Sequence, residues 1–165
     1  MQYITYFKYF LRHKWYVFWA CMKVRVPFWV ALFHDWDKFL PEMVISYSNY
    51  FYNTDGTDKQ IRDKRGYYNP LQTGNPRFDM ARFMHMTRNK HHWQYWTMLD
   101  SRSQQIIQNM PEVYIREMIA DWMGAHKAQK STGSVNEWYY RHKDEIVLSH
   151  DTRNRVESLL TGFNI

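Results

Sequence analysis

Apolar residues recur at helical spacing along most of the chain. They stand three or four positions apart in nearly every segment, and no run alternates convincingly with the period of two that a half-buried strand would show. The pattern predicts an all-α fold. Because 165 residues suffice to bury a core of their own, we expect residues 1–165 to form a single compact helical domain.

Proline residues mark the first helix boundaries. We expect one helix over residues 3–24, followed by a second helix that Pro27 begins and that carries FWVALFHDWDKF. Pro41 either closes this second helix or begins the third, which contains EMVISYSNYFY. The segment 53–76 is rich in glycine, asparagine and charged residues, so it is predicted to be a long loop.

Helical periodicity resumes after this loop. It runs through RFDMARFMHMTRNKHH and continues, with or without a break, through WQYWTML. Pro111 precedes EVYIREMIADWMGAHKA in the position of a helix start, and KSTGS then predicts a turn. The last expected helix is HDTRNRVESLL, with Asp151 as its N-cap.

Composition narrows the class of protein. Hydrophobic residues make up 45% of the chain, which fits a folded globular protein, and the single cysteine, Cys21, excludes an internal disulfide or a cysteine-rich zinc knuckle. Lys8, Arg12 and Lys14 interrupt the apolar N-terminal segment before it is long enough to span a bilayer. We therefore expect a cytoplasmic protein without a membrane partner. The net charge of +6 favours an anionic ligand.

Residues that commonly bind metal ions recur in the predicted helices. In chain order they are His13, the pair His34 and Asp35, His85, the pair His91 and His92, and Asp121. Imidazole nitrogen and carboxylate oxygen are the ligands that Zn, Mn, Fe and Ni sites use. On a continuous helix His85 and His92 would share a face, while His34 and Asp35 would diverge by about 100°, so that the carboxylate could bridge two ions. Several helices that converge such residues build a dinuclear centre.

Each of these residues also has an ordinary structural explanation. A single histidine on a helix is more often hydrogen-bonded or at the surface than a ligand. The dipeptide His150–Asp151 repeats His34–Asp35, but it precedes a helix start and stands outside the order of the other histidines, so we expect a cap there. Four tryptophans flank the expected ligands and either pack in the core or stack on a nucleobase: Trp36, Trp93, Trp96 and Trp122.

The order of the expected ligands resembles the HD superfamily of metal-dependent phosphohydrolases. The strings HDWDKFLPE, HMTRNKHHWQYW and EMIADWMGA further resemble a small, largely uncharacterised family of phages and bacteria with the motifs HD-x-SKF, H-x-x-x-N-x-HH-x-x-x-W and EM-x-x-DW. The likeness covers about residues 9–160. It implies an HD-like helical bundle, a metal site and hydrolysis of a phosphate ester, in the host cytoplasm if the source is a phage. Asp37 stands where the motif has serine, so it is either a further ligand or a supporting acceptor.

The resemblance and the spacing together suggest roles for the ligands. Asp35 is expected to bridge two divalent ions, with His34 and Asp121 completing the site of one ion and His91 and His92 serving the other. Such ions would be two of Mn, Zn, Ni, Co, Mg or Fe.

Other residues have less specific expectations. His13 and His85 would either bind metal or contact phosphate. Lys38 is expected to reach a substrate phosphate, and Glu117 to orient a liganding histidine, so that these two residues join Asp35 in catalysis. The remaining candidates are Glu42 and Asn89 for orienting histidines, and Arg82 and Arg88 for clamping a phosphate.

Three functions fit this sequence. The leading one is hydrolysis of a nucleotide or another small phosphorylated metabolite. A di-iron oxygenase could use the same ligands, with iron and oxygen consumption as its signature. The third is a non-enzymatic module that binds single-stranded nucleic acid or a host protein and holds a structural metal, although its basic residues are scattered among the acidic ones. A homodimer would fit a surface rich in aromatic residues.

Overall fold

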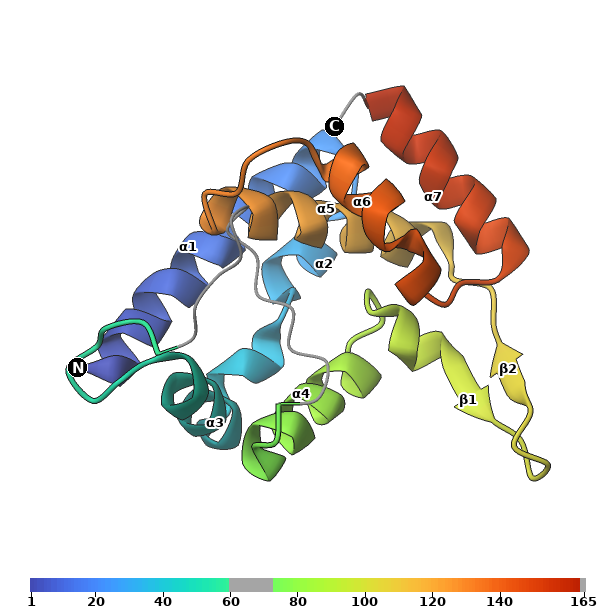
Figure 1. Ribbon diagram of the computed structural model, residues 1–165. Coiled ribbons are helices and arrows are strands. Elements are labelled where there is room, and N and C mark those ends of the chain that lie inside the picture. Colours follow the sequence, from blue (N-terminus) through green and yellow to red (C-terminus); the bar gives the residue numbers. More distant parts are fainter. Residues whose placement is uncertain (60–72, 164–165) are drawn as a thin grey trace.

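The computed structural model describes residues 1–59 and 73–163, and these are mainly helical (Figure 1). Within these two ranges, three short 3-10 helices accompany the α-helices: η1 (Trp36–Phe39), η2 (Trp93–Trp96) and η3 (Lys143–Glu145). The α-helices in the described residues are α1 (Gln2–Lys23), α2 (Phe28–Phe33), α3 (Pro41–Phe51), α4 (Pro76–Arg88), α5 (Glu112–Ala128), α6 (Val135–His142) and α7 (His150–Phe163). The prediction of a predominantly helical fold is confirmed.

The main core forms where α5 lies across α1 (Figure 1). Gly124 of α5 makes this approach possible, because a Cβ atom there would lie 2.7 Å from the backbone nitrogen of Val17 and would also overlap its side chain. Helices α6 and α7 cover the other side of α5, and the side chains of Val17, Cys21 and Ile119 are fully buried in this core.

A second, smaller core lies towards the N-terminal end of α1. Tyr6 and Phe10 of α1 pack there with Tyr52, which follows α3. Phe78 of α4 meets the same aromatic group through Tyr47, at 5.0 Å between ring centroids. The two cores leave α1 in contact with both halves of the molecule, and His13 lies between the residues that it contributes to each.

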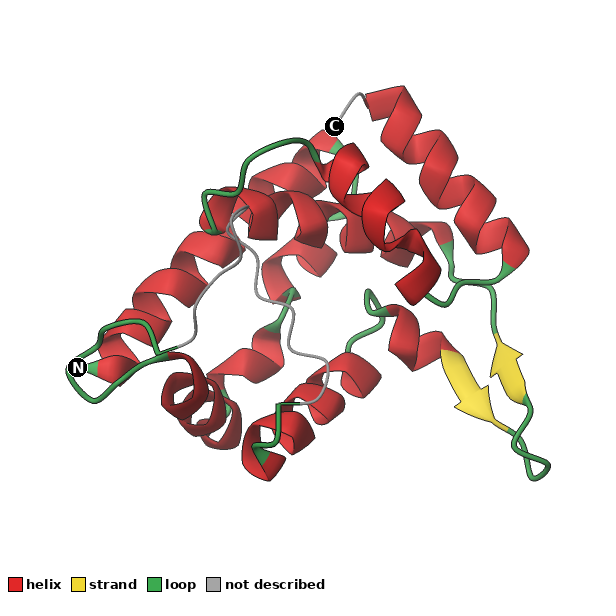
Figure 2. Cartoon of the chain, in the orientation of Figure 1, coloured by secondary structure: helices red, strands yellow, loops and turns green. Residues whose placement is uncertain are grey.

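A small β-hairpin departs from the predicted fold (Figure 2). Strands β1 (Thr97–Leu99) and β2 (Gln105–Ile107) pair antiparallel, with Thr97 opposite Ile107, so the expectation of helix through WQYWTML is wrong beyond Trp96. The strands are three residues long and mostly exposed, so they bury too few side chains to produce an alternating pattern. Asp100 shapes the turn by accepting bonds from the backbone of the loop.

Two predicted helices are shorter than expected. The second ends at Phe33, before His34 and Asp35, and α4 ends at Arg88, before the His91–His92 pair. Each of these helix ends comes just before proposed ligands, because the backbone leaves the helical conformation there. Asp35 takes the left-handed conformation (φ 55°), which a helix does not contain, and Asn89 takes an extended one.

The bounds of the other predicted helices are close to the expected ones. One observed helix, α6, was not predicted; it begins with a capping box formed by Ser134 and Glu137. The N-cap assigned to Asp151 is wrong, because Ser149 accepts the bond from the Thr152 amide and Asp151 lies within the first turn. In the predicted loop, residues 53–59 and 73–75 are described and are mostly irregular, with an isolated bridge between Asp58 and Tyr52, and the rest lies outside the described residues. No helix in the described ranges is long and apolar enough to cross a membrane.

Candidate metal centre

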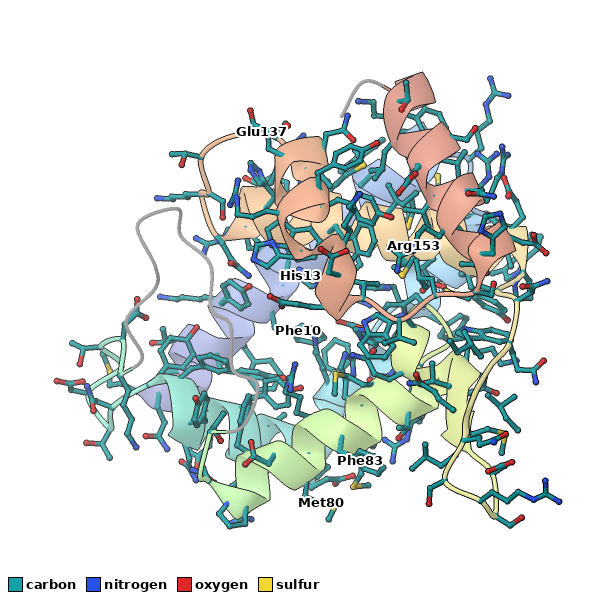
Figure 3. All side chains as sticks on the ribbon, turned by 45° about the vertical axis from the view of Figure 1, so that its right-hand side comes forward. Phe10, His13, Met80, Phe83, Glu137 and Arg153 are labelled. Atoms are coloured by element: carbon teal, nitrogen blue, oxygen red, sulfur yellow. The ribbon has the colours of Figure 1, made fainter. Side chains whose placement is uncertain are left out.

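All seven predicted metal ligands meet between the two cores. They come from α1, from the turn after α2, from α4 and the turn that follows it, and from α5. Figure 3 places His13 near the middle of the molecule, whereas Met80 and Phe83 of α4 lie on its outer edge. The ligand atoms fall into two groups of four, each compact enough to surround one ion: His13, His34, Asp35 and Asp121, and Asp35, His85, His91 and His92.

The turn after α2 places two ligands side by side. His34 ends the helix in an extended conformation, and Asp35 follows at φ 55° and ψ 30°. Both side chains are directed inward and are almost completely buried, with 2% and 1% of their surface exposed. The expected divergence of about 100° on a helix is therefore wrong, because a backbone turn rather than a helix face presents the pair.

The first group joins α1 and α5 through this turn. His13 Nε2 lies 3.2 Å from Asp121 Oδ1, and His34 Nε2 lies 3.4 Å from the same oxygen. Asp35 Oδ2 completes the group at 3.5 Å from His13 Nε2. His13 is therefore as close to the other atoms of this group as His34 and Asp121 are. The spacing along the chain had not assigned His13 to either ion.

The second group forms where α4 ends. His85 is in the last turn of α4, and the chain then bends back so that His92 Nε2 comes within 2.9 Å of His85 Nε2. His91 Nε2 lies 3.3 Å from Asp35 Oδ1, and His85 Nε2 lies 3.5 Å from it. A helix break, rather than the expected shared helix face, brings these histidines together.

Asp35 belongs to both groups. Its Oδ1 atom faces His34, His85 and His91, and its Oδ2 atom faces His13 and accepts a bond from Lys38 Nζ at 2.7 Å. Burial alone would raise the pKa of Asp35, but the positive charges around it, led by His34 and Lys38, hold the pKa well below its usual value. Asp35 is therefore an ionised carboxylate shared by two sets of nitrogen ligands.

Buried carboxylates orient three of the histidines. Glu117 Oε1 lies 3.0 Å from His34 Nδ1 and 3.3 Å from His91 Nδ1, so both rings direct Nε2 toward Asp35. Asp37 holds His85 in the same way, with both oxygens 3.1 Å from Nδ1. His34, His91 and Glu117 are close enough to form a third metal site, but this pattern is the usual support of liganding histidines, and we assign it that role.

The expected supporting residues divide between this network and the surface. Asp37, which replaces the serine of the resembled motif, is fully buried, and Asn89 is buried with its amide 2.9 Å from the carbonyl of His85. Glu42 is exposed in the first turn of α3. Asp37 also lies 3.7 Å from Arg88, whose guanidinium lies over the ring of Trp36, so Arg88 contacts the supporting network.

The centre contains buried polar atoms that lack hydrogen-bond partners. Among the described residues these include His13 Nε2, His34 Nε2, His91 Nε2 and Asp35 Oδ1, all directed into the cluster. Buried polar atoms in proteins are normally satisfied, so four unsatisfied ones at a single point indicate a missing partner. Nitrogen and carboxylate oxygen are suitable ligands for Zn, Mn, Fe, Co or Ni, and the residues present therefore fit a metal centre.

The histidines respond differently to burial. Burial lowers the pKa of His34, His91 and His92. In His91 the neighbouring carboxylates of Asp35 and Glu117 outweigh this effect and raise the pKa to about 10, and the pKa of His34 is also raised. The pKa of His92 is well below its usual value, because burial and the neighbouring His91 and His85 all disfavour a proton. In the absence of metal, some histidine nitrogens therefore carry protons that balance the negative charge of the neighbouring carboxylates. Bound metal cations would balance the same negative charge.

A cavity of about 270 Å³ opens beside the first group. His13 and Asp121 form part of its wall, together with Lys38 and Arg82. The remaining wall is largely aromatic, from Tyr6, Tyr9, Phe10, Tyr47, Phe51, Tyr52 and Phe78. These tyrosines and phenylalanines were not among the predicted site residues, because their spacing along α1, α3 and α4 resembles that of ordinary core residues.

The tryptophans that flank the ligands in sequence do not line this cavity. Trp122 packs on Trp138 and Tyr139, and Trp93 and Trp96 pack against the main core. His150 lies far along the chain at the start of α7, where Asn154 contacts its ring, and it is not among the candidate ligands.

Comparison with known proteins identifies the family. The chain matches a family profile described as a family of unknown function, DUF5662, over residues 2–162. No curated protein and no solved structure matches it. The relation to the HD superfamily therefore stays a hypothesis from the motifs and the geometry of the centre. Because the match covers nearly the whole sequence, the chain belongs to the DUF5662 family.

Proposed function

We propose that the protein is a metal-dependent phosphohydrolase with two divalent ions. One observation carries the proposal, which is that a single buried carboxylate, Asp35, is shared by two compact groups of ligands. A bridging carboxylate between two nitrogen-rich sites is the arrangement that dinuclear hydrolases use to hold neighbouring ions. The order of the ligands along the chain, which resembles the HD superfamily, agrees with this chemistry.

The two ligand groups would each hold one ion. His13, His34 and Asp121 would hold one ion, and the second group would hold the other, with Asp35 common to both. Divalent ions held there would supply Lewis-acid chemistry, by polarising a phosphoryl oxygen and increasing the acidity of water. Glu117 and Asp37 keep the ligand nitrogens oriented and are positioning residues in this account.

Lys38 brings a positive charge to both the centre and the cavity. Its ammonium group contacts Asp35 at 2.7 Å and also lines the cavity. Burial alone would lower the pKa of Lys38, but Asp35 and neighbouring groups raise it above the usual value, so the side chain stays protonated. A permanent positive charge at this position can bind a phosphoryl oxygen and stabilise negative charge that develops during its transfer. Arg82 lines the same cavity and would contribute a second positive charge.

The shape of the cavity suggests the kind of substrate. Tyr6, Tyr47 and Phe78 provide aromatic surface in the same cavity, where Lys38 Nζ lies 5.8 Å from the centre of the Tyr47 ring, and the volume of about 270 Å³ suits a small molecule. A phosphate ester with a planar ring, such as a nucleotide, would place its phosphate near Lys38 and its ring among the aromatic side chains. The aromatic wall would also exclude water from the reacting groups.

Phosphate release from a panel of esters tests the proposal. Metal-free protein would be reconstituted in turn with Mn, Zn, Ni, Co, Mg and Fe and offered nucleoside monophosphates, an aryl phosphate and glycerol phosphate. We expect metal-dependent release that favours the ring-bearing esters, that is lost in Asp121→Asn and that is retained in His150→Asn. Oxygen consumption by the iron form without phosphate release would indicate an oxygenase on the same ligands. Absence of both activities with every metal would contradict the proposal.

A further inference from the structure

Positive charge is concentrated at the N-terminal end of the chain. Residues 1–34 contain no aspartate or glutamate and five basic residues, which are Lys8, Arg12, Lys14, Lys23 and Arg25. The whole chain has 22 basic and 16 acidic residues, so positions 35–165 hold 17 and 16. The excess charge of the protein therefore lies almost entirely on α1 and the turn that follows it. The proposed ligand Asp35 is the first acidic residue, and it is buried.

The same two helices expose large apolar side chains. Trp15 and Trp19 are 61% and 54% exposed on α1, and Phe28, Trp29 and Phe33 are each more than half exposed on α2. Soluble proteins commonly expose single apolar residues, but a contiguous patch of this kind usually marks an interaction site.

Ring contacts connect the aromatic side chains of α1 with the first residue of α2. Trp15 packs edge-on against Trp19 at 5.7 Å between ring centroids, and Phe18 contacts Trp19 at the same distance. Phe18 also contacts Phe28, which extends the surface from α1 to α2. We call this surface the α1–α2 face, and it comprises Leu11, Trp15, Phe18, Trp19, Phe28, Trp29, Leu32 and Phe33.

Basic residues accompany this face along α1. Lys8 stands between the exposed Ile4 and Leu11 at helical spacing, and Lys23 and Arg25 are exposed where α1 ends. Lys14 crosses to α2 by donating to the carbonyl of Leu32 at 3.3 Å. Basic side chains therefore accompany the apolar ones along α1 and in the turn before α2, and neither helix carries a carboxylate.

We propose that the α1–α2 face docks on the surface of an anionic phospholipid membrane. Tryptophan is favoured at the boundary between lipid and water, and nearby lysine and arginine are attracted to acidic headgroups. Such a face lies on the membrane and needs no spanning helix. The expectation of no membrane partner was based on the absence of a membrane-spanning segment. It did not consider binding to the membrane surface.

Charge and side-chain chemistry favour this occupant over two others. In a symmetric dimer through the α1–α2 face, two positive surfaces without acidic residues would oppose each other. Single-stranded nucleic acid would gain stacking from the tryptophans but little from the aliphatic Ile4, Leu11 and Leu32, whose side chains favour an apolar layer. The proposal is independent of the metal centre, since none of these residues is a candidate ligand.

Vesicle binding tests this proposal. Full-length protein would be sedimented with vesicles of phosphatidylcholine, with and without phosphatidylserine, while tryptophan emission is recorded. We expect binding that requires phosphatidylserine, a blue shift of the emission and a loss of binding at high salt. The double variant Lys8→Glu, Lys23→Glu should weaken binding by on the order of tenfold or more.

Matched apolar variants show which surface is responsible. Trp15→Ser with Trp29→Ser should abolish binding, whereas Met98→Ser with Leu99→Ser, which alters exposed residues of β1, should leave it unchanged. Circular dichroism and thermal melting would establish that both variants are folded. The proposal is overturned if wild-type protein does not sediment, or if both pairs reduce binding equally. It is also overturned if the Trp15/Trp29 variant instead dissociates a dimer or loses binding to a single-stranded oligonucleotide.

Discussion

Asp35 occupies a backbone conformation that few residues other than glycine adopt. Its φ of 55° stores a cost that the surrounding structure must offset, and residues in this state often belong to functional sites. The conformation directs His34 and Asp35 to the same interior point, which a regular helix would not do. The structure thus relates an unusual residue geometry directly to the arrangement of the proposed ligands.

Glu117 acts on two ligands at once, so its loss should weaken metal binding. In Glu117→Gln, a neutral amide would replace the carboxylate that contacts His34 and His91. We expect metal affinity to fall by about 10–100-fold, measured by competition with a chromogenic chelator. Glu112→Gln, on the same helix but at the surface, is the matched control and should bind metal normally. Equal affinities for wild type and Glu117→Gln would show that the carboxylate does not support the ligands.

Lys38 should affect turnover more than metal content. Replacement by methionine removes the positive charge that lines the cavity while keeping most of the side-chain volume. We expect kcat/KM for phosphate release to fall by about 100-fold with the metal stoichiometry unchanged. Lys127→Met, at an exposed position of α5, should retain activity. A Lys38→Met enzyme with normal kcat/KM would remove Lys38 from the proposed reaction.

At the scale of elements, α5 is held against α1 at Gly124. Alanine at this position would place a methyl group 2.7–2.8 Å from backbone atoms of Val17. We expect Gly124→Ala to lower the free energy of unfolding by about 1–3 kcal/mol, measured by urea denaturation.

Gly162→Ala provides the opposite expectation for a helical glycine. Open space surrounds this position in α7, so alanine should stabilise the protein by about 0.5–1 kcal/mol. If Gly124→Ala instead has the same free energy of unfolding as the wild type, α1 and α5 can move apart slightly without a loss of stability, which would contradict the expectation for Gly124.

The elements also show what the sequence could and could not predict. Periodicity predicted the long helices α1 and α5, because each buries one continuous stripe against the core. It did not predict the ends of α2 and α4, where isolated turns at Asp35 and Asn89 depend on tertiary contacts. Residue chemistry identified the candidate ligands, whereas the aromatic wall of the cavity looked like core. No local signal distinguishes Tyr47 facing a cavity from Tyr139 buried in the main core.

For the molecule as a whole, the centre joins parts that are otherwise packed in separate cores. A metal that binds only the folded protein should therefore stabilise it, and at a concentration of about 100 times Kd the gain is about 2.7 kcal/mol. For a chain of this size we expect the melting temperature to fall by about 5–10 °C after chelation. Differential scanning calorimetry with and without chelator measures this change. Identical melting temperatures would indicate that the cluster binds no metal under those conditions.

The most direct test of the account is the number of metal ions per chain. Protein purified without chelator and then saturated with Mn, Zn or Fe would be measured by elemental analysis, beside Asp35→Ala and His150→Ala. The shared carboxylate predicts about two ions in wild type and in His150→Ala, and loss of both ions in Asp35→Ala. Two ions retained in Asp35→Ala, or none in the saturated wild type, would contradict a dinuclear centre bridged by Asp35.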